Sequence, residues 1–142
     1  MVITTSKFAL LVKNGSFDNM NTAALIASGA VANDHEVLMF FMHDAVWSLK
    51  KDIFQTNRSI HSVYPEVTKR IEQVDKNGKL QNWFKLIPQL KEIGEIKIVA
   101  CGLMMDMFGL VKEDLVDFVD EVAGVAYFTG EAANSDTIMT IG

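Results

Sequence analysis

Continuous runs of apolar residues alternate along the chain with segments whose apolar residues recur at helical spacing. Runs that end in turn-forming residues predict buried strands, and they lie at residues 7–12, 36–42, 95–100, 125–128 and 136–141. The segments between them predict helices, at residues 22–32, 43–51, 83–94 and 112–124. Such strands separated by helices are typical of a parallel sheet covered on both faces. The pattern therefore predicts an α/β fold: a three-layer, open, mostly parallel five-stranded sheet with helices on both faces, flavodoxin-like, with strand order 2-1-3-4-5.

The helix expected at 112–124 depends on an apolar stripe and on a C-terminal glycine. Its stripe consists of Leu115, Phe118, Val119 and Val122, and Gly124 follows as a C-cap signal.

Residues 52–82 interrupt the alternation, because they are polar and weakly periodic. Within them, Pro65 is expected to open a helix that carries Val67, Ile71 and Val74 on one face. Long segments of this kind in compact domains are lids, binding segments or subunit contacts, and a solvated insertion is an equal alternative. We expect a single domain over residues 1–142, with 52–82 as an insertion that forms a lid or an oligomer contact.

Composition and charge narrow the classes of function. The chain has 142 residues, of which 49% are hydrophobic and 22% charged, which is typical of a globular protein. A formal net charge of -5 disfavours binding to nucleic acid or to an anionic membrane surface. Neither a signal peptide nor an apolar run long enough to cross a membrane is evident. One cysteine cannot form an intrachain disulfide, so we expect a reducing, cytoplasmic location.

That cysteine, Cys101, stands in "KIVACGLMMDMFG", where a predicted strand ends and a helix begins at Gly102. In open α/β sheets, ligands bind outside the carboxyl ends of the strands. With the order above, Cys101 would face the loop after the first strand across a crevice. A helix N-terminus stabilises a thiolate, which is the nucleophilic form of cysteine. The alternative is an inert, buried cysteine, since free cysteine is among the most buried residue types.

Other residues give weaker indications of chemistry. Asn14, Gly15 and Gly102 are predicted to contribute to an anion or ligand site, although Asn14 and Gly15 also suit a simple turn. The chain lacks both the dinucleotide-binding fingerprint and the P-loop pattern. The three histidines and Cys101 do not have metal-ligand spacing, so we predict no metal and no cofactor.

Two long stretches resemble the DsrE/DsrF-like family, in particular the branch sometimes labelled peroxiredoxin-like. They are "KFALLVKNGSFDNMNTAALIASGAVANDHEVLMFF" and "LKEIGEIKIVACGLMMDMFGLVKEDLVDFVDEVAGVAYF". The strand–Cys–helix segment followed by "MFG" and "KEDL" is the most specific part, and 52–82 resembles the family least. The resemblance implies a DsrE-like fold and a homo-oligomeric sulfur-relay protein. Cys101 corresponds to the family cysteine that carries sulfur as a persulfide or thiosulfonate, and the implied partners are a TusA-like carrier or a rhodanese-type donor.

The chain departs from this family after the second strand, where it reads "FFMHDAVW" instead of an aromatic-rich run. His43 is therefore a candidate for proton transfer or for pairing with an anionic thiosulfonate. A structural role, with His43 capping a helix and Asp44 in its first turn, is favoured.

Two functions remain open at this point. The first is a sulfur carrier or sulfurtransferase component that uses Cys101. The second is a non-catalytic oligomeric module on the same fold, which binds a ligand or partner and has an inert thiol.

Overall fold

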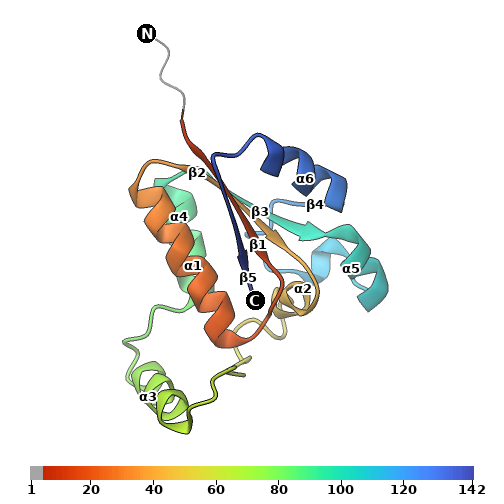
Figure 1. Cartoon of the computed structure of the whole chain (residues 1–142). Coiled ribbons are helices and arrows are strands. Elements are labelled where there is room, and N and C mark those ends of the chain that lie inside the picture. The colour runs from red at the N-terminus through yellow and green to blue at the C-terminus, as the bar shows by residue number, and fades with distance from the viewer. Residues whose placement is uncertain (1–4) are drawn as a thin grey trace.

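The computed structural model describes residues 5–142, which form a five-stranded sheet with helices on both of its faces (Figure 1). All the pairings in the sheet are parallel. The strands are β1 (Lys7–Val12), β2 (Glu36–Phe41), β3 (Ile96–Cys101), β4 (Glu121–Ala123) and β5 (Thr137–Ile141). The predicted α/β architecture is confirmed.

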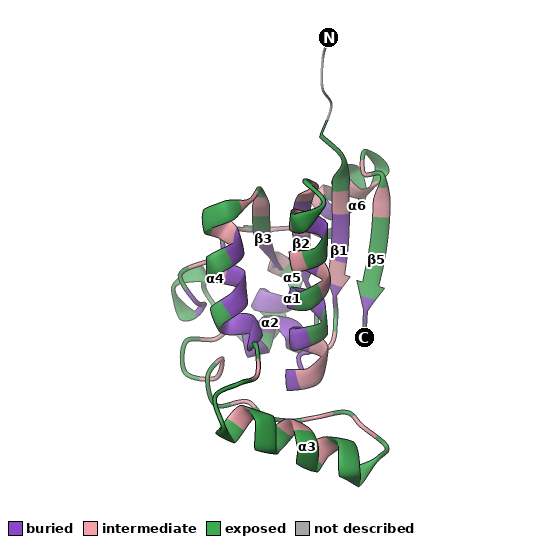
Figure 2. Cartoon of the chain, turned by 90° about the vertical axis from the view of Figure 1, so that its left-hand side faces the viewer, coloured by how far each residue is buried: buried purple, intermediate pink, exposed green. Residues whose placement is uncertain are grey.

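The central strands are apolar because both of their faces are covered. Leu10 of β1, Met39 of β2 and Ile98 of β3 pair side by side, and all three are fully buried. Figure 2 shows buried residues in these central strands and on the sides of α1 and α4. On the opposite face, the ring of Phe40 stacks on Phe128 at 5.1 Å between centroids. The core therefore lies on both sides of β1, β2 and β3.

The predicted strand order is wrong. The observed order is β4-β3-β2-β1-β5, so β2 lies between β1 and β3. The chain adds each strand from β1 to β4 in one direction and returns to the other side of β1 only for β5. The order therefore reverses between β1 and β5, and Cys101 does not face the loop after β1 across a crevice.

The helices are α1 (Phe17–Ala32), α2 (Asp44–Ser48), α3 (Pro65–Lys76), α4 (Trp83–Ile93), α5 (Gly102–Phe108) and α6 (Val125–Ala133), with a short 3₁₀ helix, η1 (Lys112–Asp114). Helices α1 and α4 lie side by side on one face of the sheet, and α6 lies on the other (Figure 1). Helix α3 begins at Pro65 as predicted, whereas α1 begins five residues earlier than expected. No helix within residues 5–142 combines the length and apolar character needed to cross a membrane.

The secondary structure predicted for 112–128 is wrong. The expected helix over 112–124 is reduced to η1 and followed by extended chain and β4, while 125–128 begins α6 instead of a strand. The backbone N–H of Val116 donates to Leu49 O, and that of Asp120 donates to Ile98 O. Bonds to distant segments therefore replace those of a local helix. Gly124 caps the start of α6 instead of the end of a helix.

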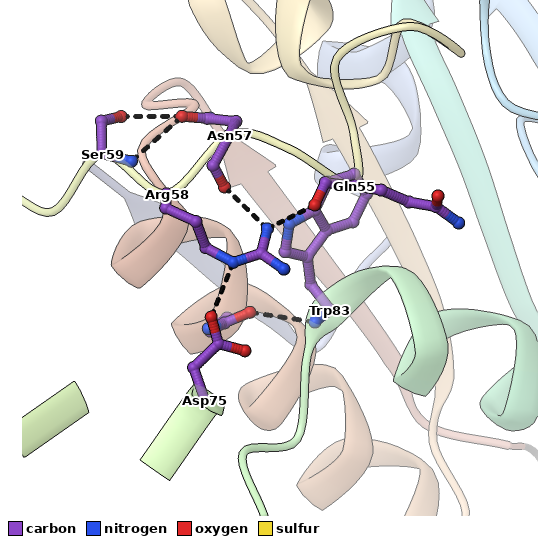
Figure 3. A network of polar contacts seen from close by, with 7 residues as sticks. Gln55, Asn57, Arg58, Ser59, Asp75 and Trp83 are labelled. Carbon is purple, nitrogen blue, oxygen red and sulfur yellow. Dashed lines mark hydrogen bonds and ion pairs between the residues drawn. The ribbon is translucent and has the colours of Figure 1, made fainter. Parts of the chain in front are cut away.

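Residues 52–64 fold back as a strap over the start of α1. The N–H of Phe17 donates to the carbonyl oxygen of Ser59 at 2.7 Å, so the strap caps an otherwise unpaired amide of α1. Nε of Arg58 donates to Asp75 of α3 at 2.7 Å (Figure 3). The guanidinium of Arg58 lies 4.6 Å from the ring centroid of Phe17. The contacts with Phe17 hold the strap on α1, and the pair with Asp75 joins it to α3, while the role of residues 52–82 as a lid or an oligomer contact stays a prediction.

Candidate functional site

Cys101 occupies the predicted junction between strand and helix. It is the last residue of β3 and the residue before α5, with an extended backbone. Gly102 follows as the first residue of α5, and a Cβ at that position would make only an ordinary contact with Val122. The expected position of the thiol at the carboxyl edge of the sheet is therefore confirmed.

The expectation that this thiol is open to solvent is wrong for this structure. Cys101 is 0% exposed. Side chains alternate along a strand, so Cys101 faces the same side of the sheet as Val99, which pairs with Phe40 beneath α6. Met105 in the following helix is also buried. A reagent can reach the sulfur only after part of this cover moves.

The turn after β1 is closed by its own hydrogen bonds. The N–H of Gly15 donates to Asp44 Oδ1 at 2.8 Å, and the N–H of Ser16 donates to Asn14 Oδ1 at 2.9 Å. Ser48 Oγ donates to the carbonyl oxygen of Gly15 at 2.6 Å. An anion bound here would have to replace these side-chain oxygens, and the anion site at Asn14 and Gly15 stays a prediction.

Gly15 is expected to tolerate no side chain. A Cβ there would come far inside contact distance of the carbonyl oxygen of Asp44 and of Ser48 Oγ. We expect Gly15→Ala to lower the free energy of unfolding by about 1–3 kcal/mol, because the turn must shift. The matched control is Gly29→Ala in α1, where nothing lies within 4 Å of the new methyl group. This control should be stabilising by about 0.5–1 kcal/mol, since alanine favours a helix. Equal urea stability of the two variants would contradict this description of the turn.

His43 has an unusual backbone at the end of β2. Its φ of 51° and ψ of -137° lie in a region that non-glycine residues rarely adopt. The side chain is exposed and makes no capping hydrogen bond to α2, whereas Asp44 lies in the first turn of α2 as predicted. Because Phe41 pairs with Ala100, His43 leaves the sheet beside the strand that ends at Cys101. His43 therefore occupies the N-cap position of α2, as its structural role predicts, but its side chain makes no capping hydrogen bond.

Two hollows lie along this carboxyl edge. One, of about 500 Å³, is lined by His43, Phe108 and residues at the ends of β1 and β5. The other, of about 360 Å³, lies between the turn after β1 and the strap, where Nδ2 of Asn14 is 3.1 Å from Nδ1 of His61. Neither hollow is lined by Cys101.

The strap residues of the second hollow, including His61 and Asn57, were not predicted as site residues. Asn57 Nδ2 donates to the carbonyl oxygen of Gly15 at 2.8 Å. No periodic pattern relates residues so far apart in the chain. Within residues 5–142, no three His, Cys, Asp or Glu side chains gather as a metal site.

A third hollow, of about 450 Å³, opens at the amino ends of β1, β2 and β3. Lys97 lines it, with Nζ 3.0 Å from Glu121 Oε1 and 5.3 Å from the ring centroid of Tyr127. The Tyr127 hydroxyl and then the Glu121 carboxylate raise the pKa of Lys97 above its usual range. Lys97 is therefore a paired cation at the end of the sheet opposite to Cys101.

Comparisons with known proteins agree with this fold. The chain is 29% identical to the uncharacterized protein YrkE of Bacillus subtilis (strain 168), over 93% of this chain and 94% of that protein. It is 25% identical to the sulfur carrier protein DsrE2 of Allochromatium vinosum, over 95% of this chain and 98% of that protein. The solved structure of MTH1491 from Methanobacterium thermoautotrophicum, a protein of unknown function, has a similar fold, with a TM-score of 0.59 at 13% identity and coverage of 94% of this chain and 98% of that one.

The family model described as "DsrE/DsrF/DrsH-like family" matches residues 57–140. This range is more than half of the chain and includes Cys101 and α5. The protein therefore belongs to the DsrE/DsrF/DrsH-like family.

Proposed function

We propose that this protein is a sulfur carrier or sulfurtransferase component that takes up sulfane sulfur on Cys101 and passes it on. Three observations support the proposal. The chain belongs to this family, a relative over almost its whole length is a sulfur carrier protein, and its one cysteine ends β3 at the carboxyl edge of the sheet. The position of Cys101 is the observation that carries the proposal.

The chemistry needs one thiol on this chain. The Cys101 thiolate attacks the outer sulfur of a donor persulfide, the donor S–S bond breaks, and the donor leaves as a thiolate. With tetrathionate, the same attack leaves a thiosulfonate on Cys101 and releases thiosulfate. The thiol of the next protein then collects the sulfur, so a second cysteine is unnecessary. A rhodanese-type donor and a TusA-like acceptor in the cytoplasm would suit this exchange, with exposed His43 pairing with the anionic group.

Burial adds a step to this scheme. Because Cys101 is 0% exposed, the relay requires a conformation in which α5 moves away from the end of β3. This helix spans only seven residues and ends at Gly109, whose φ of 69° is left-handed. Short elements with few buried residues open at low free-energy cost. Between transfers, the cover protects a bound persulfide from water and from unrelated thiols.

Intact-mass analysis tests this function. The folded protein is incubated with thiosulfate, tetrathionate or a low-molecular-weight persulfide, and excess donor is removed. We expect an adduct of one sulfur atom or one thiosulfonate group, removable by reductant and absent from Cys101→Ser. The absence of an adduct with every donor would contradict the proposal.

One observation favours a second function, a non-catalytic module that binds a ligand or a partner. The thiol is fully buried, while two hollows at the same edge are open to small molecules. This alternative predicts that donor treatment adds no mass to either the unmodified chain or Cys101→Ser. It also predicts that both chains bind ligands equally at those hollows. The mass experiment therefore separates the two functions.

A further inference from the structure

The two edges of the sheet differ in how they are protected from pairing with another chain. Natural sheets protect edge strands by shortness, charge, proline or bulges, because unpaired backbone groups invite another strand. At one edge, β4 has three residues and includes Glu121. At the other edge lies β5, which is mostly exposed (Figure 2) and has the sequence TIMTI, without a charge or a proline.

Strand β5 also exposes apolar side chains on both faces of the sheet. Ile138 is 55% exposed on one face, and Met139 is 38% exposed on the other. The chain carries a net charge of -5, and this strand contributes no charged side chain to a contact between two copies. Asp136, which directly precedes the strand, accepts a hydrogen bond from the N–H of Lys7 at 2.7 Å.

The outer edge of β5 carries free backbone groups. The N–H of Lys13 donates to the carbonyl oxygen of Ile141 at 3.1 Å, so the backbone of Ile141 faces β1. In a parallel ladder, alternate residues direct both backbone groups to the same neighbour. Ile138 and Thr140 therefore direct their N–H and C=O groups outward, where no strand formed by residues 5–142 lies.

We propose that β5 pairs with the β5 strand of a second copy, antiparallel, about a two-fold axis at Met139. Ile138 of each copy then exchanges two hydrogen bonds with Thr140 of the other, and the two Met139 side chains lie opposite each other. Four backbone donors and four acceptors become paired, and none of the paired residues carries a charged side chain. The argument for this interface uses only the exposure and the backbone groups of β5, so the interface does not depend on the proposed sulfur relay.

A cross-linking experiment tests this geometry. In the Cys101→Ser background, Met139→Cys places one thiol of each copy in a directly opposed, non-hydrogen-bonded pair, where Cα atoms are about 4.5 Å apart, close enough for a disulfide. Mild oxidation with copper and dissolved oxygen should give a covalent dimer. The matched control is Thr137→Cys on the same strand, since its two copies would lie about 13 Å apart and should not link.

Sedimentation analysis of the unmodified chain gives an independent readout. We expect a dimer that is lost in Thr140→Pro, because proline removes an outward N–H and leaves the bonds to β1 in place. Leu25→Lys on the outer face of α1 should leave the dimer intact. A monomeric native chain, a dimer that persists in Thr140→Pro, or equal linking by both cysteine variants would each overturn the proposal.

Discussion

In the folded protein, Cys101 is expected to react with an alkylating reagent at least about 100-fold more slowly than in the unfolded chain, which corresponds to an opening free energy of about 3 kcal/mol. The reason is its complete burial at the junction of β3 and α5. The measurement compares alkylation rates by mass spectrometry in buffer and in denaturant. Equal rates in the two conditions would show that the thiol is open in the native state.

A matched pair of variants on α5 identifies the moving cover. Met105 is 3% exposed and Met107 is 66% exposed on the same helix. Met105→Ala removes packing beneath α5 and should accelerate native alkylation of Cys101, while Met107→Ala should leave the rate near that of the unmodified chain. An equal effect of both substitutions would argue against opening through α5.

Replacing Trp83 by alanine is expected to lower the free energy of unfolding by about 3–5 kcal/mol. Trp83 is 2% exposed at the start of α4, and its ring makes edge contacts with Phe84, Phe118 and Phe54 at centroid distances of 5.7, 6.2 and 6.5 Å. These partners connect α4 to the strap and to the segment before β4. This loss is a large share of the total free energy of unfolding, because a domain of this size is stable by only about 5–15 kcal/mol.

Trp47 provides the control for this prediction. It is 40% exposed and packs edge-on against Phe108. Trp47→Ala should cost clearly less free energy than Trp83→Ala in urea denaturation. A smaller loss for Trp83 than for Trp47 would mean that the aromatic cluster around α4 is not a main source of stability.

All four long strands, β1, β2, β3 and β5, were predicted, and the first three were the clearest because their residues are apolar at almost every position. This property requires cover on both faces and is independent of what lies next to each strand. The order of the strands was not predictable in the same way. The apolar runs of β1, β2 and β3 are equally compatible with β2 or β3 beside β1, and the choice depends on contacts between segments that are distant in the chain.

The secondary structure of residues 112–128 was predicted wrongly for a different reason. Leu115, Val116 and Val119 are buried, and their spacing suits a helix as well as an extended chain. Bonds from this segment to Leu49 and to β3 decide for extended structure. Local periodicity contains no information about such distant partners.

The candidate site was predicted in position but not in depth. A run of apolar residues followed by Cys101 and Gly102 is sufficient to place the thiol where β3 meets α5. Whether that sulfur is covered depends on side chains from α6 and α5, which the sequence does not assign to either face. The contact between Asn14 and His61 also could not be predicted from the sequence pattern, because it depends on how the strap folds back over the start of α1.

Transfer of labelled sulfur is the most direct test of the relay. The folded chain is loaded from a persulfide donor that carries an isotopically labelled outer sulfur, separated from the donor, and mixed with a thiol acceptor. We predict that the label moves first to Cys101 and then to the acceptor, leaving the chain with its original mass. A native chain that never acquires the label, while the unfolded chain does, would contradict the relay and identify Cys101 as a buried structural residue.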